Sequence, residues 1–164
     1  DRPILGVDVE CHYHDVCVVQ LASWRRGVVL DALALQAHAM GELLQPLLGD
    51  KRVCKLFHGH FNKLSCLESN FAVVVKLPIS DTAATACEDL DGMCEDGQPS
   101  LQTLCRQYLN YELDKTYQTA NWRQRPMPEE MLQYAAIDAQ VLLPLHTAIG
   151  AWFFNDWQEG FCSV

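Results

Sequence analysis

The sequence predicts a single α/β domain in which a mixed β-sheet is flanked by helices. The chain has 164 residues, which is a common length for one domain. Its first part holds three closely spaced apolar segments, and such spacing is typical of neighbouring antiparallel strands. Further along, one more short apolar strand is followed by segments whose apolar residues recur at helical spacing. Strands that come first and then alternate with helices indicate a mixed sheet covered by helices.

Short polar segments separate the strands that open the chain. These strands are expected at Ile4–Glu10, Val16–Ala22 and Gly27–Leu33. A helix is expected over Ala39–Leu48, because its apolar residues recur three and four positions apart. The next strand, Val53–His58, leads through a turn at Gly59 into another segment with helical spacing.

The second half of the chain is expected to contain more helix than strand. A strand is expected at Val73–Ile79, and Asp81 and Thr82 would cap a helix over Thr82–Leu90. The acidic segment Asp91–Ser100 contains glycine and proline, so it is expected to form a loop. The last expected elements are a helix at Leu101–Leu109, a helix at Glu129–Ile149 that Pro144 kinks or interrupts, and a tail at Trp152–Trp157 that packs on the core.

Charge and cysteine content narrow the class of protein. The net charge of −9 argues against a generally basic nucleic-acid clamp, but it leaves room for a local phosphate site in which a metal ion supplies positive charge. The eight cysteines form no C-x-x-C pair, so a zinc ribbon is not expected. Because most of these cysteines stand in apolar segments, we expect reduced thiols rather than a disulfide framework.

No segment of the sequence has the length and apolar character of a membrane span, and no signal peptide is recognisable at its start. We therefore expect an intracellular protein without membrane contact, whose nuclear, cytoplasmic or organellar location the sequence does not distinguish. The chain enters a strand within a few residues of Asp1. We expect residues 1–164 to be one domain excised from a larger protein.

Two carboxylates stand close together on the first expected strand. Asp8 and Glu10 alternate with valines, and residues two apart on a strand point to the same face. Two acids side by side on an apolar strand repel each other and lose hydration, and a divalent cation removes that cost. Hard oxygen ligands suit Mg²⁺ or Mn²⁺. Taken alone, this pattern is also compatible with a polar edge strand.

A series of motifs along the chain resembles the ribonuclease D family of 3′–5′ exonucleases, in the subclass with tyrosine in the third motif. The motifs are Asp-x-Glu at Asp8 and Glu10, His-Gly at His58, Asp-Thr at Asp81, and Tyr-x-x-x-Asp at Tyr134 and Asp138. The most specific stretch runs from Leu101 to Leu145 and contains Leu113-Asp114-Lys115, Gln118, Trp122, Arg125-Pro126 and Tyr134-Ala135 with Asp138. It is most similar to ribonuclease D and to the exonuclease branch of the nuclear exosome.

The resemblance implies a ribonuclease H-like fold and hydrolysis of RNA from its 3′ end with Mg²⁺ or Mn²⁺. Asp8, Glu10 and Asp138 would hold the metal, and Tyr134 would position the attacking water. The implied substrate is single-stranded nucleic acid, with RNA favoured over DNA, and protein partners would be reached through the parent chain. His58, Lys63, Trp122 and Arg125 are the expected contacts to nucleic acid, although Trp122 and Arg125 are equally compatible with packing.

The family pattern breaks at its second motif. Aligning His58-Gly59, Leu67 and Phe71 without a gap puts Lys63 where the family carries an aspartate. A shift by one residue would place Asn62 there and spoil the apolar register of the helix. A lysine repels a metal ion, so we expect a site with one metal or none, unless another acid completes it.

Three functions therefore remain open at the level of the sequence. The first is a 3′–5′ exoribonuclease with activity weakened by Lys63. The second is an inactive pseudo-exonuclease that binds RNA or protein. The third is a scaffold domain without a role in nucleic-acid chemistry.

Overall fold

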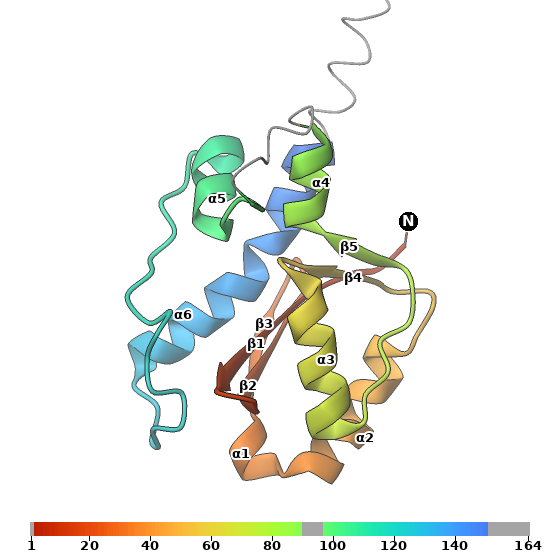
Figure 1. The fold of residues 1–164 in the computed structure, drawn as a ribbon, viewed down its shortest axis with the longest axis vertical. Coiled ribbons are helices and arrows are strands. Elements are labelled where there is room, and N and C mark those ends of the chain that lie inside the picture. Colours follow the sequence, from red (N-terminus) through yellow and green to blue (C-terminus); the bar gives the residue numbers. More distant parts are fainter. Residues whose placement is uncertain (1, 90–96, 151–164) are drawn as a thin grey trace, which may run out of the picture.

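The computed structural model describes residues 2–89 and 97–150, and it contains a five-stranded mixed sheet with helices on both faces (Figure 1). The strand order is β3-β2-β1-β4-β5. The strands are β1 (Ile4–His12), β2 (Asp15–Ala22), β3 (Gly27–Asp31), β4 (Cys54–Phe57) and β5 (Ile79–Asp81). The pairs β1–β2 and β2–β3 are antiparallel, whereas β1–β4 and β4–β5 are parallel. The predicted fold class is confirmed.

The helices cover the sheet as two separate layers. They are α1 (Ala32–Leu35), α2 (Ala37–Leu48), α3 (His60–Phe71), α4 (Thr82–Asp89), α5 (Leu101–Leu109) and α6 (Glu129–Gln140). On one face, Val7 and Val9 of β1 pack with the buried residues of α2 and α3. On the other face, Ala22 and Leu56 pack with the buried residues of α5 and α6. Alternate residues of β1 therefore face different layers, and Asp8 and Glu10 lie on the side of α6.

Two expected strands differ from those in the structure. The strand predicted at Gly27–Leu33 ends at Asp31, because the Asp31 carboxylate accepts hydrogen bonds from the backbone N–H groups of residues 33 and 34 and so caps α1. The strand predicted at Val73–Ile79 is wrong over most of its length, since only Ile79–Asp81 is strand. Upstream of it, backbone N–H groups bond to carbonyls at the ends of α2 and α3 instead of to a neighbouring strand.

The long helix predicted at Glu129–Ile149 is interrupted, as expected. The helix α6 ends at Gln140, residue 141 is a turn, and residues 142–150 are helical again. Pro144 lies in the first turn of this second segment, where a missing N–H costs little. Residues 91–96 of the predicted loop and the whole tail at Trp152–Trp157 lie outside the described residues.

Six of the cysteines lie among the described residues, and all but one of these follow the sequence expectation. Five of them are free, namely Cys11, Cys17, Cys54, Cys66 and Cys105. Cys87 is disulfide-bonded, so the expectation of reduced thiols is wrong there. Among the described residues, no helix combines the length and apolar character needed to cross a membrane.

Two details of the packing around β1 leave space for a site beside this strand. A Cβ atom on Gly6 would lie 2.3 Å from the backbone oxygen of Ala139, so glycine is what lets α6 approach β1 closely. In addition, β4 pairs with β1 only from Ile4 to Gly6. Beyond Gly6, the edge of β1 on that side faces the start of α3 instead of a strand. The carboxyl ends of parallel strands form such a crevice in many α/β folds.

Candidate metal centre

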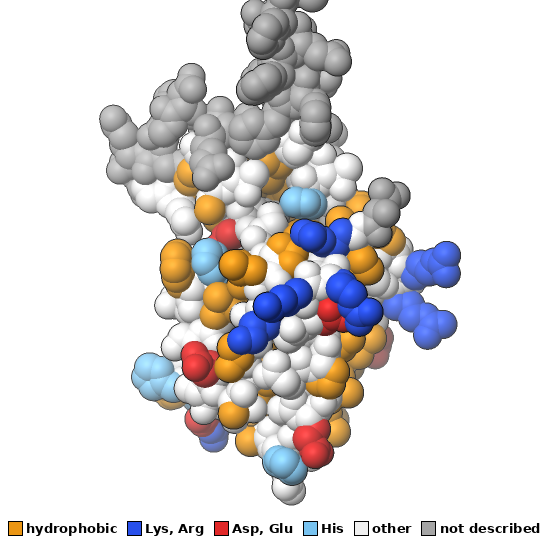
Figure 2. Space-filling model, turned by 90° about the vertical axis from the view of Figure 1, so that its right-hand side faces the viewer, with side chains coloured by type: hydrophobic (Ala, Val, Ile, Leu, Met, Phe, Trp, Pro, Cys, Tyr) orange, Lys and Arg blue, Asp and Glu red, His pale blue; other side chains and the backbone are white. Residues whose placement is uncertain are grey.

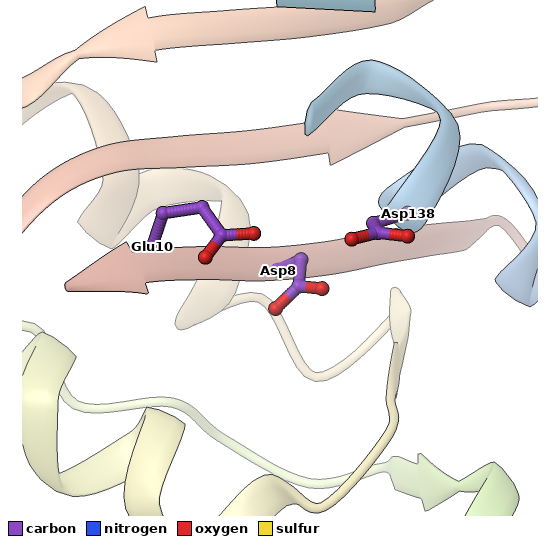
Figure 3. Close-up of side chains that lie close together, drawn as sticks. All are labelled: Asp8, Glu10 and Asp138. Atoms are coloured by element: carbon purple, nitrogen blue, oxygen red, sulfur yellow. The ribbon is translucent and has the colours of Figure 1, made fainter. Parts of the chain in front are cut away.

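Three carboxylates converge beside β1 (Figure 3). Asp8 and Glu10 project from the same face of the strand, and Asp138 comes from α6 above it. One ligand atom from each of these residues lies within 4.8 Å of the others. The chain segments that carry them are far apart in sequence, and the close contact of α6 with β1 at Gly6 brings them together.

Burial makes this cluster electrostatically costly in the absence of a cation. Asp8 is 6% exposed and Asp138 is 5% exposed. Burial, followed by the charges of Asp8 and Asp138, raises the pKa of Glu10 to about 9. Burial, followed by the charge of Asp8, raises the pKa of Asp138 to about 6. Glu10 and Asp138 are therefore poorly stabilised as anions by the protein alone.

The donor set fits Mg²⁺ or Mn²⁺. The Asp138 Oδ1 atom is buried and has no hydrogen-bond partner among the described residues, so it is free to coordinate an ion. Magnesium binds carboxylate oxygens at 2.0–2.1 Å, which places two ligands of one ion at most about 4.2 Å apart. Oxygen atoms that already lie within 4.8 Å need only a small contraction to meet this limit.

Tyr134 lies one helical turn before Asp138 on α6 and lines the same pocket. Its ring packs against Tyr117 and Trp122, with centroid distances of 5.9 and 6.1 Å. Burial and the nearby Asp138 carboxylate raise the pKa of Tyr134 well above its ordinary value. The phenol therefore keeps its proton at neutral pH, and its hydroxyl is hydrogen-bonded to the Asp138 side chain.

A pocket of about 240 Å³ surrounds the carboxylates. The pocket is also lined by three residues that were not predicted as site residues from the sequence, namely Ser100, Lys115 and Gln118. Lys115 lowers the pKa of both Glu10 and Asp138, against the larger effect of burial. A signal was present, because Lys115 and Gln118 belong to the segment that carries the family resemblance.

His58 also lines the pocket, and its hydrogen bonds define its tautomer. Its Nδ1 lies 3.0 Å from the hydroxyl oxygen of Thr82, and that hydroxyl donates to the backbone oxygen of Phe57 at 3.3 Å. Since the hydroxyl proton is used, Nδ1 must donate to Thr82, which leaves Nε2 as an acceptor. Burial, followed by the charge of Lys63, lowers the pKa of His58 to about 4. The ring is therefore neutral at physiological pH.

Lys63 reaches into the carboxylate cluster from α3. Its Nζ lies 2.6 Å from Asp8 Oδ1, and the two side chains are 19% and 8% exposed. Asn62, the other residue considered for the second motif, lines a neighbouring pocket with Cys11 and Tyr13 rather than this one. Within the described ranges, no fourth carboxylate lines the pocket. Lys63, the residue that the ungapped alignment puts at the second motif, thus lines the pocket, whereas Asn62 does not.

Asp81 lies near the pocket but serves a different role. Its carboxylate accepts hydrogen bonds from the backbone N–H groups of Gly59 and His60 at 3.0 and 2.7 Å, and from the ring of His60. It also accepts from the N–H of Ala83, which caps α4 as the sequence predicted. Asp81 thus fixes the first turn of α3, from which Lys63 extends.

Arg125 and Trp122 take the packing role that the sequence left open for them. Trp122 is 1% exposed and lies in the core beside α6. The Arg125 guanidinium forms a two-pronged ion pair with Asp31 at 2.6 and 2.7 Å and also donates to three backbone oxygens. These contacts join the segment before α6 to the end of β3.

Replacing Arg125 with alanine is expected to destabilise the fold by about 1–3 kcal/mol, because it removes the guanidinium that pairs with Asp31 and donates to three backbone oxygens. The free energy of unfolding in urea measures this effect. The control is Arg106→Ala, which removes an exposed ion pair with Glu112 and should change stability much less than Arg125→Ala does. Equal effects of the two substitutions would contradict a packing role for Arg125.

The raised pKa values predict how the stability of the metal-free protein depends on pH. Glu10 has an ordinary pKa of 4.5 that rises to about 9 in the fold, so the folded state binds its proton more tightly. The free energy of unfolding should therefore fall as pH rises through this window. Urea denaturation in EDTA at about pH 5 and about pH 9 checks this, with Glu10→Gln as the reference. The prediction fails if the stability difference between wild type and Glu10→Gln does not change with pH.

Comparison with known proteins identifies the family. A family model described as 3′-5′ exonuclease matches residues 3–151. Exosome complex component 10 of Homo sapiens is 32% identical over 160 residues, which are 94% of this chain and 17% of the human protein. Ribonuclease D of Nitrobacter hamburgensis is 31% identical over 159 residues, which are 91% of this chain and 38% of the bacterial protein.

A solved structure agrees with these relatives. The catalytic core of RRP6 from Trypanosoma brucei, a C496S mutant, superimposes with a TM-score of 0.79 at 28% identity, over 94% of this chain and 42% of that one. The chain thus spans only a minor part of the curated relatives that it matches. The match to the family model over nearly the whole chain shows that this domain belongs to the 3′–5′ exonuclease family, of the ribonuclease D and RRP6 type that its motifs predict.

Proposed function

We propose that this domain is a metal-dependent 3′–5′ exonuclease that acts on RNA, with Mg²⁺ or Mn²⁺ as its cofactor. The observation that carries the proposal is the convergence of three carboxylates, one of them with a buried and unpartnered oxygen. Tyr134 lies beside them with a protonated hydroxyl. This combination is costly for a purely structural domain and useful for holding a cation against a phosphate.

The chain's own residues divide the work of hydrolysis in this proposal. Asp8, Glu10 and Asp138 would hold the ion, which would supply Lewis acidity and lower the pKa of a water bound to it. The Tyr134 hydroxyl, which lines the same pocket, would orient the attacking water. Lys115 lines the pocket, where its ammonium can contact the non-bridging phosphate oxygens. The products are a nucleoside 5′-monophosphate and an RNA shortened by one nucleotide.

RNA is favoured as substrate by the names of the relatives, which include a ribonuclease D and exosome component 10. The name of the latter describes a member of a complex, and we infer that the parent protein likewise meets protein partners through segments outside this domain. His58 lines the pocket, and the tautomer with Nδ1 as the donor to Thr82 makes its Nε2 an acceptor. It is suited to accept a hydrogen bond from a ribose hydroxyl, a group that RNA offers at more positions than DNA.

The net charge of −9 does not oppose a nucleic-acid substrate, because the charge is unevenly distributed. Figure 2 shows a face on which Lys and Arg side chains gather. Exposed Arg2, Lys51, Arg52 and Lys76 come from segments that backbone hydrogen bonds bring together at the start of β4. These basic side chains lie at the start of β4, whereas the pocket lies beyond the end of that strand, so the patch is a separate feature of the surface.

The test is degradation of single-stranded RNA that carries a label at its 5′ end, in Mg²⁺ or Mn²⁺. We expect a ladder of labelled products that shorten one nucleotide at a time, and slower shortening of DNA with the same sequence. Binding of RNA without any ladder would overturn the enzyme proposal and favour an RNA-binding pseudo-exonuclease, which the ion pair of Lys63 with Asp8 makes the relevant alternative. Absence of both binding and cleavage would favour a scaffold.

A further inference from the structure

We infer that Lys63 supplies, as a fixed part of the protein, the positive charge that a second divalent ion would bring, so that the centre binds a single metal ion. This inference rests on the proposed function and concerns the same site. It follows from four observations on the position of the lysine, the oxygens that it occupies, the charge that it carries and the oxygens that it leaves free.

The helix that carries Lys63 is firmly held. Its first turn is fixed by Asp81, which accepts hydrogen bonds from the N–H groups of Gly59 and His60. Its far end is fixed by Leu67 and Phe71, which are buried in the core against β1. An ammonium that extends from the first turn of such a helix stays within reach of the carboxylates, and its side chain is only 19% exposed.

Lys63 bonds to one of the two carboxylate oxygens of Asp8, and a second ion would need that oxygen as a ligand. Asp8 Oδ1 lies 2.6 Å from Lys63 Nζ and also accepts the backbone N–H of Val9 at 2.7 Å. A carboxylate oxygen has two lone pairs, so these two donors saturate it. A second ion on this side would compete with the ammonium for the same oxygen and repel it. The residues present therefore do not fit a second divalent ion.

The charges show why the lysine is an adequate replacement. In the alignment with the ribonuclease D family, an aspartate of the family stands where this chain has Lys63. An aspartate together with a divalent ion carries a net charge of plus one, which is also the charge of a lysine ammonium. The total charge of the pocket with Lys63 and one ion therefore equals that of a pocket with aspartate and two ions. The pocket can hold a phosphodiester with the same electrostatic balance in both cases.

One complete set of ligands remains after Lys63 has been placed. Asp8, Glu10 and Asp138 each place a carboxylate oxygen within 4.8 Å of the others, and Asp138 Oδ1 has no hydrogen-bond partner among the described residues. Because Lys63 and the N–H of Val9 bond to Asp8 Oδ1, the other oxygen of Asp8 is the one expected to bind the ion. Lysine has three N–H donors, and Asp8 uses one of them. We therefore expect another to donate to a phosphate oxygen of the bound RNA, on the side where the second ion would otherwise lie.

The experiment counts ions, so it does not depend on turnover. Calorimetric titration with Mn²⁺ in the presence of uridine 5′-monophosphate is done on the wild type, Lys63→Asp and Lys63→Ala. We expect one ion per wild-type chain, two per Lys63→Asp chain, and one per Lys63→Ala chain, since alanine removes the charge without adding a ligand. Lys115→Ala, at the other pocket lysine, is the matched control and should bind one ion.

Two ions on the wild type would overturn the inference while leaving the proposed metal centre standing. One ion on a folded Lys63→Asp chain would overturn it as well. No ion on any of these chains would overturn both this inference and the proposed function. Because the wild-type count decides by itself, failure of Lys63→Asp to fold does not remove the test.

A second measurement addresses the contact with phosphate. With saturating Mn²⁺, Lys63→Gln should weaken the binding of uridine 5′-monophosphate about five-fold or more, because it removes a charge-assisted hydrogen bond. Unchanged affinity would overturn the phosphate contact. Circular dichroism of each variant confirms that the comparison is made between folded proteins.

Discussion

Replacing Asp138 with asparagine is expected to lower the rate of RNA degradation about 100-fold or more, because a neutral amide is a much poorer ligand for a divalent ion than a carboxylate. The carboxylate of Asp138 is buried, and among the described residues the pocket is lined by no acid besides Asp8, Glu10 and Asp138, so none is in place to compensate for its loss. The initial rate of shortening of labelled RNA, at fixed Mg²⁺, measures the effect.

The same substitution should make the metal-free protein more stable. Burial and the charge of Asp8 raise the pKa of Asp138 to about 6, so its ionised form opposes folding at neutral pH, and asparagine removes this cost. A loss of activity together with unchanged or higher stability separates a role in the site from simple misfolding. The control is Glu112→Gln, which changes an exposed acid that forms an ion pair with Arg106. If Asp138→Asn kept full activity, the carboxylate cluster would not be the centre of the reaction.

Replacing Lys63 with aspartate is the second change for which we expect a large effect, in this case an increase of about ten-fold or more in the rate of RNA degradation. Aspartate removes the ammonium that saturates Asp8 Oδ1 and adds ligands for a second ion. Two ions can stabilise both the attacking and the leaving oxygen, whereas the tethered ammonium is confined to one position. The dependence of the rate on Mg²⁺ concentration should also become steeper.

Lys63→Asn provides the matched control, because asparagine has the shape of aspartate without its charge. We expect little or no gain in activity from it. A gain of equal size with asparagine would show that removal of the lysine, and not the added ligand, raises activity. A loss of activity with both substitutions would mean that Lys63 contributes more to the reaction than a second ion would.

The sequence predicted the part of the site that depends on local periodicity. Asp8 and Glu10 alternate with valines, and the period of a strand is enough to put both acids on one face. The position of Asp138 beside them is not encoded in any local pattern, because α6 and β1 are far apart in the chain. It was expected only through the resemblance to ribonuclease D.

The features that the sequence could not reveal depend on contacts between distant segments. Nothing in the strand pattern marks Gly6 as the point where α6 touches β1, although a Cβ there would lie 2.3 Å from Ala139 O. Likewise, the strand predicted at Val73–Ile79 fails because its N–H groups bond to carbonyls at the ends of α2 and α3. Propensity alone does not register such competing partners.

Lys63 illustrates both sides of this comparison. Its alignment with the second motif could be read from the spacing of His58-Gly59, Leu67 and Phe71. The ion pair between its Nζ and Asp8 could not be predicted from this spacing, because it depends on where α3 and the short strand β4 lie relative to β1. The ion pair places a cation where the family carries a metal ligand, and this lowers the expected number of metal ions in the site from two to one.

The most direct test of the account is diffraction from crystals of the wild-type domain soaked in Mn²⁺ with a short RNA 3′ end, collected at a wavelength where manganese scatters anomalously. We expect one anomalous peak, between Asp8, Glu10 and Asp138, with the Lys63 ammonium beside the terminal phosphate. Two full peaks would contradict the role of Lys63 as the second cation. The absence of any peak between the three carboxylates would contradict the metal centre itself.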